Sequence, residues 1–396
     1  MKKMTLNLIL AISFATVMGC SEAVDNQMTQ STDDDQPTVD DLSYAEKAKA
    51  VYDLIQQQYT VGDIYRENSP QMAGDNEYCY LWPYVGMLTA GNVLYDLGYD
   101  ISIHTKEFEG VEAFYDNRPV LPSYQAYPTV GGSSDHYYDD ASIVAMEFID
   151  AYRLTNNQAY LDRAIILGDF IMSGEDDRMG GGLYWLEAVS DQCVNEENCI
   201  KAANTTAYAS YVASELYKET NINNYLDFAI RTYEWNYNTL RDASDNLYWN
   251  DIKISSEQIN PVKWSYNAAM MIMSGVNLYE ITDDMAYLNQ AMSTAQSAYS
   301  RFTRVTNDQL FYTANDPWFN VELMTSYIRL SEYKPTVSTY VQTFINNIDY
   351  AWENARTADG RFYEDWSGAV EGRSRWLLHQ ACMIEAYGRA AKFLEN

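Results

Sequence analysis

Two adjacent carboxylic acids, Asp139 and Asp140, stand at the start of a stretch whose apolar residues recur with helical spacing, ASIVAMEFIDAY. Consecutive side chains of a helix point about 100° apart, so the two acids can address different atoms of one bound molecule. A pair of carboxyl groups can cleave a glycosidic bond. An aspartate near a helix start is also a common cap or dipole partner. Adjacent aspartates occur elsewhere too, at 34–35, 40–41, 176–177 and 283–284.

The closeness of the two acids favours one stereochemical course. Carboxyl groups about 5–5.5 Å apart act by double displacement with retention, whereas inversion needs about 6.5–9.5 Å to hold a water. Neighbouring side chains suit the shorter separation. We expect Asp139 to be the nucleophile, kept ionised by the helix N-terminus, and Asp140 to be the general acid and then base. The residues alone leave the reverse assignment open.

Composition narrows the substrate class. The 396 residues carry a formal net charge of −30, which disfavours nucleic acids and other polyanions as ligands. The chain contains 35 Tyr and 9 Trp, whose rings can stack on the apolar faces of sugars, although most of them are expected in helix contacts. A neutral carbohydrate polymer fits this balance better than a charged one.

From residue 43 onwards, apolar residues recur with helical spacing and strand-like alternation is scarce. The pattern predicts twelve helices, at about 43–59, 78–97, 103–116, 138–154, 158–173, 203–219, 223–240, 263–281, 285–302, 317–333, 338–355 and 372–394. Three copies of a Tyr-containing motif begin at Tyr152, Tyr217 and Tyr279, 65 and 62 residues apart, each with a second Tyr eight residues on. This period indicates helical hairpins. We expect an all-α (α/α)6 barrel of six such hairpins, with an open solenoid as the alternative.

Loop lengths locate the expected binding site. The connections after every second helix are short and the others are long, so a closed barrel places all long loops at one end. Binding residues should gather there. The residues that we expect to bind a sugar at this end are Tyr138, Gly181, Gly182, Trp185, Asn204, Trp249, Asp251, Tyr266, Asn267 and Trp318. The same rim holds further aromatic residues at Tyr80, Trp82, Trp264 and Trp376.

The segment YYDDASIVAMEFIDAYRLTNNQAYLDRA, followed by FIMSGEDDRMGGGLYW, resembles the signature region of glycoside hydrolase family 76, the endo-α-1,6-mannanases. The later segments Asn204-Thr205-Thr206, LYWNDI and Tyr266-Asn267 also resemble that family. The resemblance implies an (α/α)6 barrel, with Asp139 and Asp140 as nucleophile and acid/base. It implies the α-1,6-mannose backbone of fungal-type mannan as the substrate. Asn315-Asp316-Pro317-Trp318-Phe319 departs from the family pattern, which bears on the distal sugar subsites.

The N-terminus predicts export. Residues 1–20 have a basic start, an apolar middle and small residues before Cys20, and the run Val17–Cys20 resembles a bacterial lipobox. Lipidation of Cys20 would anchor the protein at the periplasmic or cell-surface side of the outer membrane; an ordinary signal peptide is the alternative. Residues 21–42 are polar and acidic and are expected to be a disordered tether. The catalytic domain is then 43–396.

The cysteines and histidines predict a disulfide and no metal site. Cys193 and Cys199 share one polar loop and form a plausible disulfide in an exported protein. The three histidines show no ligand spacing, so we expect neither a metal nor a cofactor. The partners expected are α-mannan or its oligosaccharides, with no nucleic acid, membrane contact only through the lipid anchor, and a monomeric protein. Two alternative functions remain: a non-catalytic glycan-capturing lipoprotein and a transglycosylase on the same fold.

Overall fold

Twelve α-helices make up most of the computed structural model, which describes residues 42–187, 198–313 and 316–395. The described residues belong to one compact unit, Leu42–Asn396. The helices are α1 Tyr44–Tyr59, α2 Leu81–Asp96, α3 Ile101–Gly110, α4 Tyr138–Thr155, α5 Gln158–Met172, α6 Ala203–Thr220, α7 Asn223–Thr239, α8 Ser265–Thr282, α9 Met285–Phe302, α10 Pro317–Ser331, α11 Ser338–Asn354 and α12 Leu377–Glu395. Each lies close to its predicted range.

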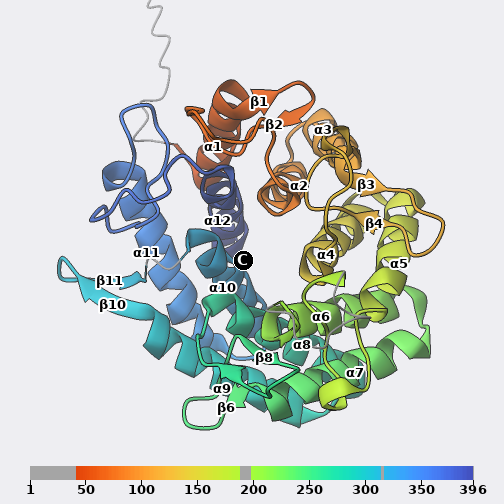
Figure 1. The fold of residues 1–396 in the computed structure, drawn as a ribbon. Helices are drawn as coiled ribbons and strands as arrows, with labels where there is room; N and C mark the ends of the chain where they lie inside the picture. Colours follow the sequence, from red (N-terminus) through yellow and green to blue (C-terminus); the bar gives the residue numbers. More distant parts are fainter. Residues whose placement is uncertain (1–41, 188–197, 314–315, 396) are drawn as a thin grey trace, which may run out of the picture. The chain divides into compact units, whose positions relative to one another are not determined.

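The helices form two concentric rings. The even-numbered helices pack on one another around the inside, and the odd-numbered helices lie outside them (Figure 1). Burial follows this arrangement: α8 is buried almost all round from Asn267 to Leu278, whereas α1 buries one stripe, Ala48, Val51, Tyr52, Ile55 and Tyr59. The ring closes because α12 packs against both α1 and α2. This confirms the (α/α)6 barrel and excludes the open solenoid.

The repeated Tyr motif encodes the short turns. At the end of α4, Asn156 adopts a left-handed conformation with φ 55°, and its N–H donates to the Tyr152 carbonyl. Asn221 after α6 and Asp283 after α8 repeat this geometry, with φ of 56° and 58°. Asn and Asp tolerate the left-handed region better than other residues with a side chain. The repeat therefore reverses the chain after each of these inner helices.

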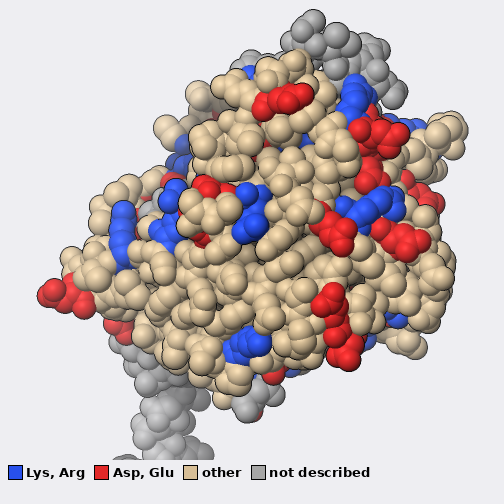
Figure 2. Space-filling view, turned by 90° about the horizontal axis from the view of Figure 1, so that it is seen from below, with Lys and Arg blue, Asp and Glu red and all other residues tan. Residues whose placement is uncertain are grey.

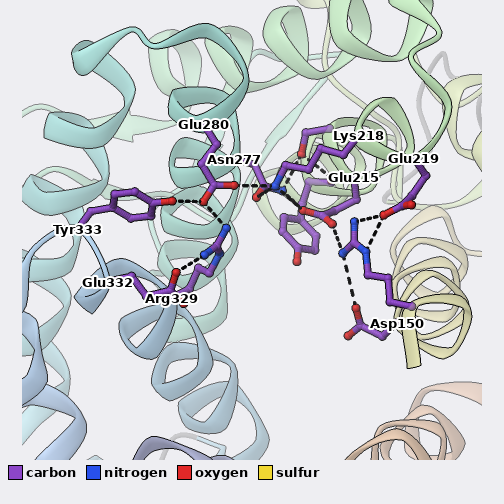
Figure 3. Close-up of polar contacts among 12 residues, drawn as sticks. Asp150, Glu215, Lys218, Glu219, Asn277, Glu280, Arg329, Glu332 and Tyr333 are labelled. Carbon is purple, nitrogen blue, oxygen red and sulfur yellow. Dashed lines mark hydrogen bonds and ion pairs between the residues drawn. The ribbon is translucent and has the colours of Figure 1, made fainter. Parts of the chain in front are cut away.

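Ion pairs link the inner helices at the short-turn end (Figure 3). The Lys218 ammonium on α6 donates to Glu215 at 3.1 Å, to Asn277 of α8 at 2.6 Å and to Glu280 of α8 at 2.8 Å. Arg329 of α10 reaches the same Glu280 carboxylate. Arg153 of α4 pairs with Glu215, so one continuous network of paired charges links the four inner helices α4, α6, α8 and α10.

Short paired strands lie in the long connections, at the end of the barrel opposite the short turns. They are β1 Thr60–Val61, β2 Ile64–Tyr65, β3 Tyr115–Asp116, β4 Ser123–Tyr124, β5 Ile200–Ala202, β6 Arg241–Asp242, β7 Leu247–Tyr248, β8 Asp251–Lys253, β9 Ile259–Asn260, β10 Thr303–Thr306 and β11 Gln309–Tyr312. All pairings are antiparallel, and β5, β8 and β9 form a three-stranded sheet in which Asp251 pairs with Ala202 and Asn260. These pairs stiffen the loops that surround the site.

The surface carries mixed charge. On the face seen in Figure 2, acidic and basic side chains lie near one another and are separated by uncharged surface. Within the described residues, no helix is long and apolar enough to cross a membrane.

Candidate active site

A pocket of about 590 Å³ opens at the long-loop end of the barrel, where the inner helices begin. Asp139 and Asp140 both line it, and so do the expected residues Trp185, Asn204, Tyr266 and Trp318. Its other lining residues are Glu67, Tyr80, Trp82, Pro83, Ala126, Tyr137, Ile143, Ile200, Ala202, Tyr208, Asn250, Trp264 and Trp376. The pocket therefore lies at the end of the barrel that the loop lengths predict for the site.

The Asp139 carboxylate is held by three donors. Its Oδ2 accepts hydrogen bonds from the Trp185 indole N–H at 3.0 Å and from the Asn204 amide at 2.7 Å. Its Oδ1 accepts from the backbone N–H of Asp140 at 3.1 Å. Burial raises the pKa of Asp139 to about 6, while these hydrogen bonds oppose the rise because they stabilise the ionised form.

Asp140 has a different environment. Burial and the nearby negative charge of Asp139 raise the pKa of Asp140 well above its ordinary value. Both effects favour the neutral form of Asp140. The negative charge of the pair is therefore divided unequally between the two acids. Near neutral pH the geometry favours an ionised Asp139 beside a protonated Asp140, which is the division of roles that acid-assisted nucleophilic attack requires.

Aromatic rings from α2, α8, α10 and the segment before α12 pack together at the pocket, backed by Phe319. Trp82 of α2 meets Trp318 and Trp376 edge-on, with ring centroids 5.7 and 5.2 Å apart. Phe319 stacks on both Trp82 and Tyr266, at 6.1 and 4.1 Å. Tyr137 packs on Trp185 at 4.8 Å. Indole and phenol rings in the lining of a pocket suit a sugar, whose C–H faces stack on them.

Asp251 acts on the pocket indirectly. It is buried on β8, and its Oδ2 accepts hydrogen bonds from the amides of Asn250 and Asn260, both at 2.8 Å. Asn250 lines the pocket, and among the described residues its Oδ1 has no hydrogen-bond partner. Asp251 therefore orients the amide of Asn250, a residue that lines the pocket.

The glycine-rich turn does not reach the pocket, contrary to expectation. Its backbone wraps the buried ammonium of Lys201, which donates to the carbonyls of Arg178 at 2.8 Å and Gly181 at 2.6 Å and to Asp176 Oδ1 at 2.7 Å. Gly182 has φ 74°, and a Cβ there would lie 2.5 Å from the Trp235 ring. Gly181 and Gly182 are needed for this packing, and neither is among the residues that line the pocket.

The structure also differs from the prediction that Tyr138 binds a sugar. Its ring is buried and stacks on Phe170 of α5 at 4.8 Å, so it fixes the start of α4 from the outer side. The preceding residue, Tyr137, occupies the pocket instead. Trp249 and Asn267 lie outside the pocket lining as well: Asn267 is fully buried in the first turn of α8, and Trp249 is half-buried beside β7.

Several predictions from the sequence concern residues that the structure does not describe. Cys199 is disulfide-bonded, and Cys79 and Cys382 are free, so its partner is not among the described cysteines. The expected partner Cys193 lies outside the described residues, as do the signal segment, Cys20 and nearly all of the acidic tether. Among the described residues, no group of three His, Cys, Asp or Glu side chains is arranged to hold a metal ion.

Among the polar and aromatic residues that line the pocket, sequence reasoning missed Glu67, Tyr137, Tyr208 and Asn250. Asn250 and Tyr137 directly adjoin residues that were singled out, and a shift by one position would have found them. Tyr208 lies one helical turn after Asn204, on the same face of α6, which a helical projection reveals. Glu67 stands in a loop with no motif around it.

A closed (α/α)6 barrel with two differently held acids in an aromatic pocket defines a carbohydrate-cleaving enzyme, a glycoside hydrolase. The model of glycosyl hydrolase family 76 matches residues 43–387. The chain belongs to this family.

Solved structures and a curated relative are similar to this chain. A family 76 mannosidase from Bacteroides thetaiotaomicron superposes with a TM-score of 0.79 at 22% identity, over 89% of this chain and 98% of that one. An inactive α-1,6-mannanase variant from Salegentibacter sp., with two adjacent aspartates replaced by asparagine and α-1,6-mannotriose bound, superposes with a TM-score of 0.74. Its identity is 20%, over 89% of this chain and 100% of that one. The mannan endo-1,6-α-mannosidase of Saccharomyces cerevisiae is 22% identical over 173 residues, 42% of this chain but only 37% of the yeast protein.

Proposed function

We propose that this chain is a retaining, endo-acting α-1,6-mannanase that cleaves the backbone of fungal-type mannan. The observation that carries the proposal is the tandem pair Asp139 and Asp140 in an aromatic pocket, with three hydrogen-bond donors on the first acid. The α-1,6-mannanase from Salegentibacter sp. supports it, because replacing two adjacent aspartates inactivates that enzyme and α-1,6-mannotriose binds to it.

The first chemical step uses both acids. An Asp139 carboxylate oxygen attacks the anomeric carbon of a mannosyl unit, and the bond from that carbon to the glycosidic oxygen breaks. Asp140 gives its proton to the departing oxygen, which leaves as the 6-hydroxyl of the next mannose. The donors Trp185 and Asn204 keep Asp139 oriented and ionised until it attacks.

The second step releases the sugar. The Asp140 carboxylate, now ionised, takes a proton from a water molecule while the water oxygen attacks the anomeric carbon. The bond to Asp139 breaks, its carboxylate is restored, and the product keeps the original anomeric configuration. Transfer to another sugar hydroxyl instead of water would give transglycosylation by the same steps.

The first test is incubation of the domain, residues 43–396, with linear α-1,6-mannan, with products separated over time. We expect medium-length oligosaccharides early and short ones late, because an endo-acting enzyme cuts internal bonds. Asp139→Asn and Asp140→Asn should each lower the rate at least a thousandfold. Retention of the polymer without cleavage would contradict the proposal and favour glycan capture.

We also propose that the protein is an exported lipoprotein, anchored through Cys20 at the periplasmic or cell surface. Support comes from the sequence of residues 1–20 alone. Metabolic labelling with a fatty-acid analogue, compared between the wild type and Cys20→Ala, tests it. Label in the wild type that is lost in the variant is the expected result, and an unlabelled wild-type protein would contradict it.

A further inference from the structure

Glu67 is a third carboxylate in the active-site pocket, and it stands apart from the catalytic pair. It follows β2 in the loop between α1 and α2, and its backbone carbonyl accepts from the N–H of Leu377, the first residue of α12. Asp139 and Asp140 lie on α4, on the other side of α2. In the inner ring, α2 lies between α4 and α12, whose first residue Glu67 contacts, so Glu67 and the acid pair line different parts of the pocket.

The Glu67 side chain is fixed in place. Its Oε1 accepts a hydrogen bond from the Trp376 indole N–H at 2.9 Å, and its Oε2 lies 3.5 Å from the Asn76 amide, at the limit of a hydrogen bond. A bridge between Asn68 and Trp376 ties the loop to the start of α12. One carboxylate oxygen is thus well bonded and the other is weakly bonded, in a residue that lines the pocket.

The nearby basic residues leave Glu67 without a salt bridge. Arg375 pairs with Asp75, and Arg373 pairs with Asp316 at 2.7 Å. Among the ion pairs of the described residues, none includes Glu67. Burial accordingly raises the pKa of Glu67 above its ordinary value. A half-buried carboxylate with spare acceptor capacity is costly, and hydroxyl donors from a ligand would offset that cost.

We propose that Glu67 is a specificity-determining residue that binds hydroxyl groups of a mannosyl unit other than the one being cleaved. This inference rests on the proposed function. Each mannose of an α-1,6-linked backbone has free 2-, 3- and 4-hydroxyls, so adjacent hydroxyls can donate to one carboxylate. Trp82, which meets Trp376 edge-on at 5.2 Å, supplies an aromatic surface beside them. Glu67 therefore makes the enzyme prefer chains long enough to reach this subsite.

The test compares wild type, Glu67→Gln and Glu109→Gln on α-1,6-mannooligosaccharides of two to six units. The glutamine keeps the shape of Glu67 and can still accept from Trp376, but it loses the charged acceptor. Glu109 is exposed on α3, so Glu109→Gln controls for the change in charge. We expect Glu67→Gln to lower kcat/KM about tenfold above a threshold length, mainly through KM, and by less than about twofold below it.

Two results would overturn the inference while leaving the mannanase intact. One is an equal loss of kcat on every length with a lowered melting temperature, which marks a structural role. The other is no change on any length. If the wild type cleaves none of these oligosaccharides and no linear mannan, the proposed function fails and the inference falls with it.

Discussion

The indole N–H of Trp185 donates to Oδ2 of Asp139 at 3.0 Å, and the backbone carbonyl of the same Trp185 accepts from the N–H of Tyr138 at 3.0 Å. One residue of the long loop after α5 is therefore fastened both to the start of α4 and to the acid that α4 presents. The relationship links the position of the loop to the ionisation of the proposed nucleophile.

Trp185→Phe should therefore weaken catalysis and change its pH dependence. Phenylalanine keeps an aromatic ring but removes the donor, so kcat should fall about tenfold. The pKa of Asp139 should rise, because one hydrogen bond that stabilises its ionised form is lost. The acidic limb of the pH profile then moves to higher pH. Trp249→Phe, which changes a half-buried ring outside the pocket, is the matched control, and an equal loss in both variants would contradict this role.

The wild-type pH profile should be bell-shaped. Asp139 must be ionised, so activity should fall as the pH drops through about 6, the raised pKa of this carboxyl. Asp140 must be protonated, so activity should fall again as the pH rises through the raised pKa of the Asp140 carboxyl. The pair titrates as a unit, and kcat/KM measured from pH 4 to 10 reports the two apparent values. Activity that keeps rising to pH 10 would contradict the assignment of Asp140 as the acid.

Asp140→Asn should stabilise the fold at alkaline pH. The folded pKa of Asp140 lies above its unfolded value, so the folded protein keeps a proton that the unfolded chain releases. The free energy of unfolding of the wild type therefore decreases as the pH rises above about 4 towards that raised pKa. Neutral asparagine avoids this loss. Thermal unfolding should show a melting temperature about 2 °C or more above wild type at pH 8 and little difference at pH 4. A variant less stable than wild type at pH 8 would contradict the raised pKa.

Lys201→Met should destabilise the barrel through the glycine-rich turn. The Lys201 ammonium is fully buried, and removing it takes a donor from the carbonyls of Arg178 and Gly181. Asp176 loses the same donor but keeps its hydrogen bonds from Arg178 and Tyr184. The expected cost is about 3 kcal/mol, or about 6 °C in melting temperature. Lys253→Met, at a half-buried position on β8, provides a comparison, and equal melting temperatures for the two variants would argue against this role.

Much of the fold was predictable because its signals are local. Apolar spacing marked each helix, and the repeated Tyr motif marked the left-handed turns at Asn156, Asn221 and Asp283. The alternation of short and long loops indicated the end of the barrel at which the pocket lies. These patterns depend on residues within a few positions of one another, and a single sequence displays them directly.

The site was less predictable where distant residues decide the role of a side chain. The turn at Gly181 and Gly182 looked suited to a sugar, but Lys201, about twenty positions later, occupies its carbonyls. Glu67 lies at the pocket because the loop after β2 meets the start of α12, more than 300 residues further along the chain. No spacing of residues in the sequence predicts such a long-range contact.

The most direct test follows the cleavage of linear α-1,6-mannotetraose by the wild-type domain with proton NMR from the first minutes. Attack by Asp139, with Asp140 as acid and then base, predicts that the new reducing end appears first as the α-anomer and converts to the β-anomer only by mutarotation. A β-anomer formed first would contradict the double displacement. An uncleaved substrate would contradict the mannanase itself.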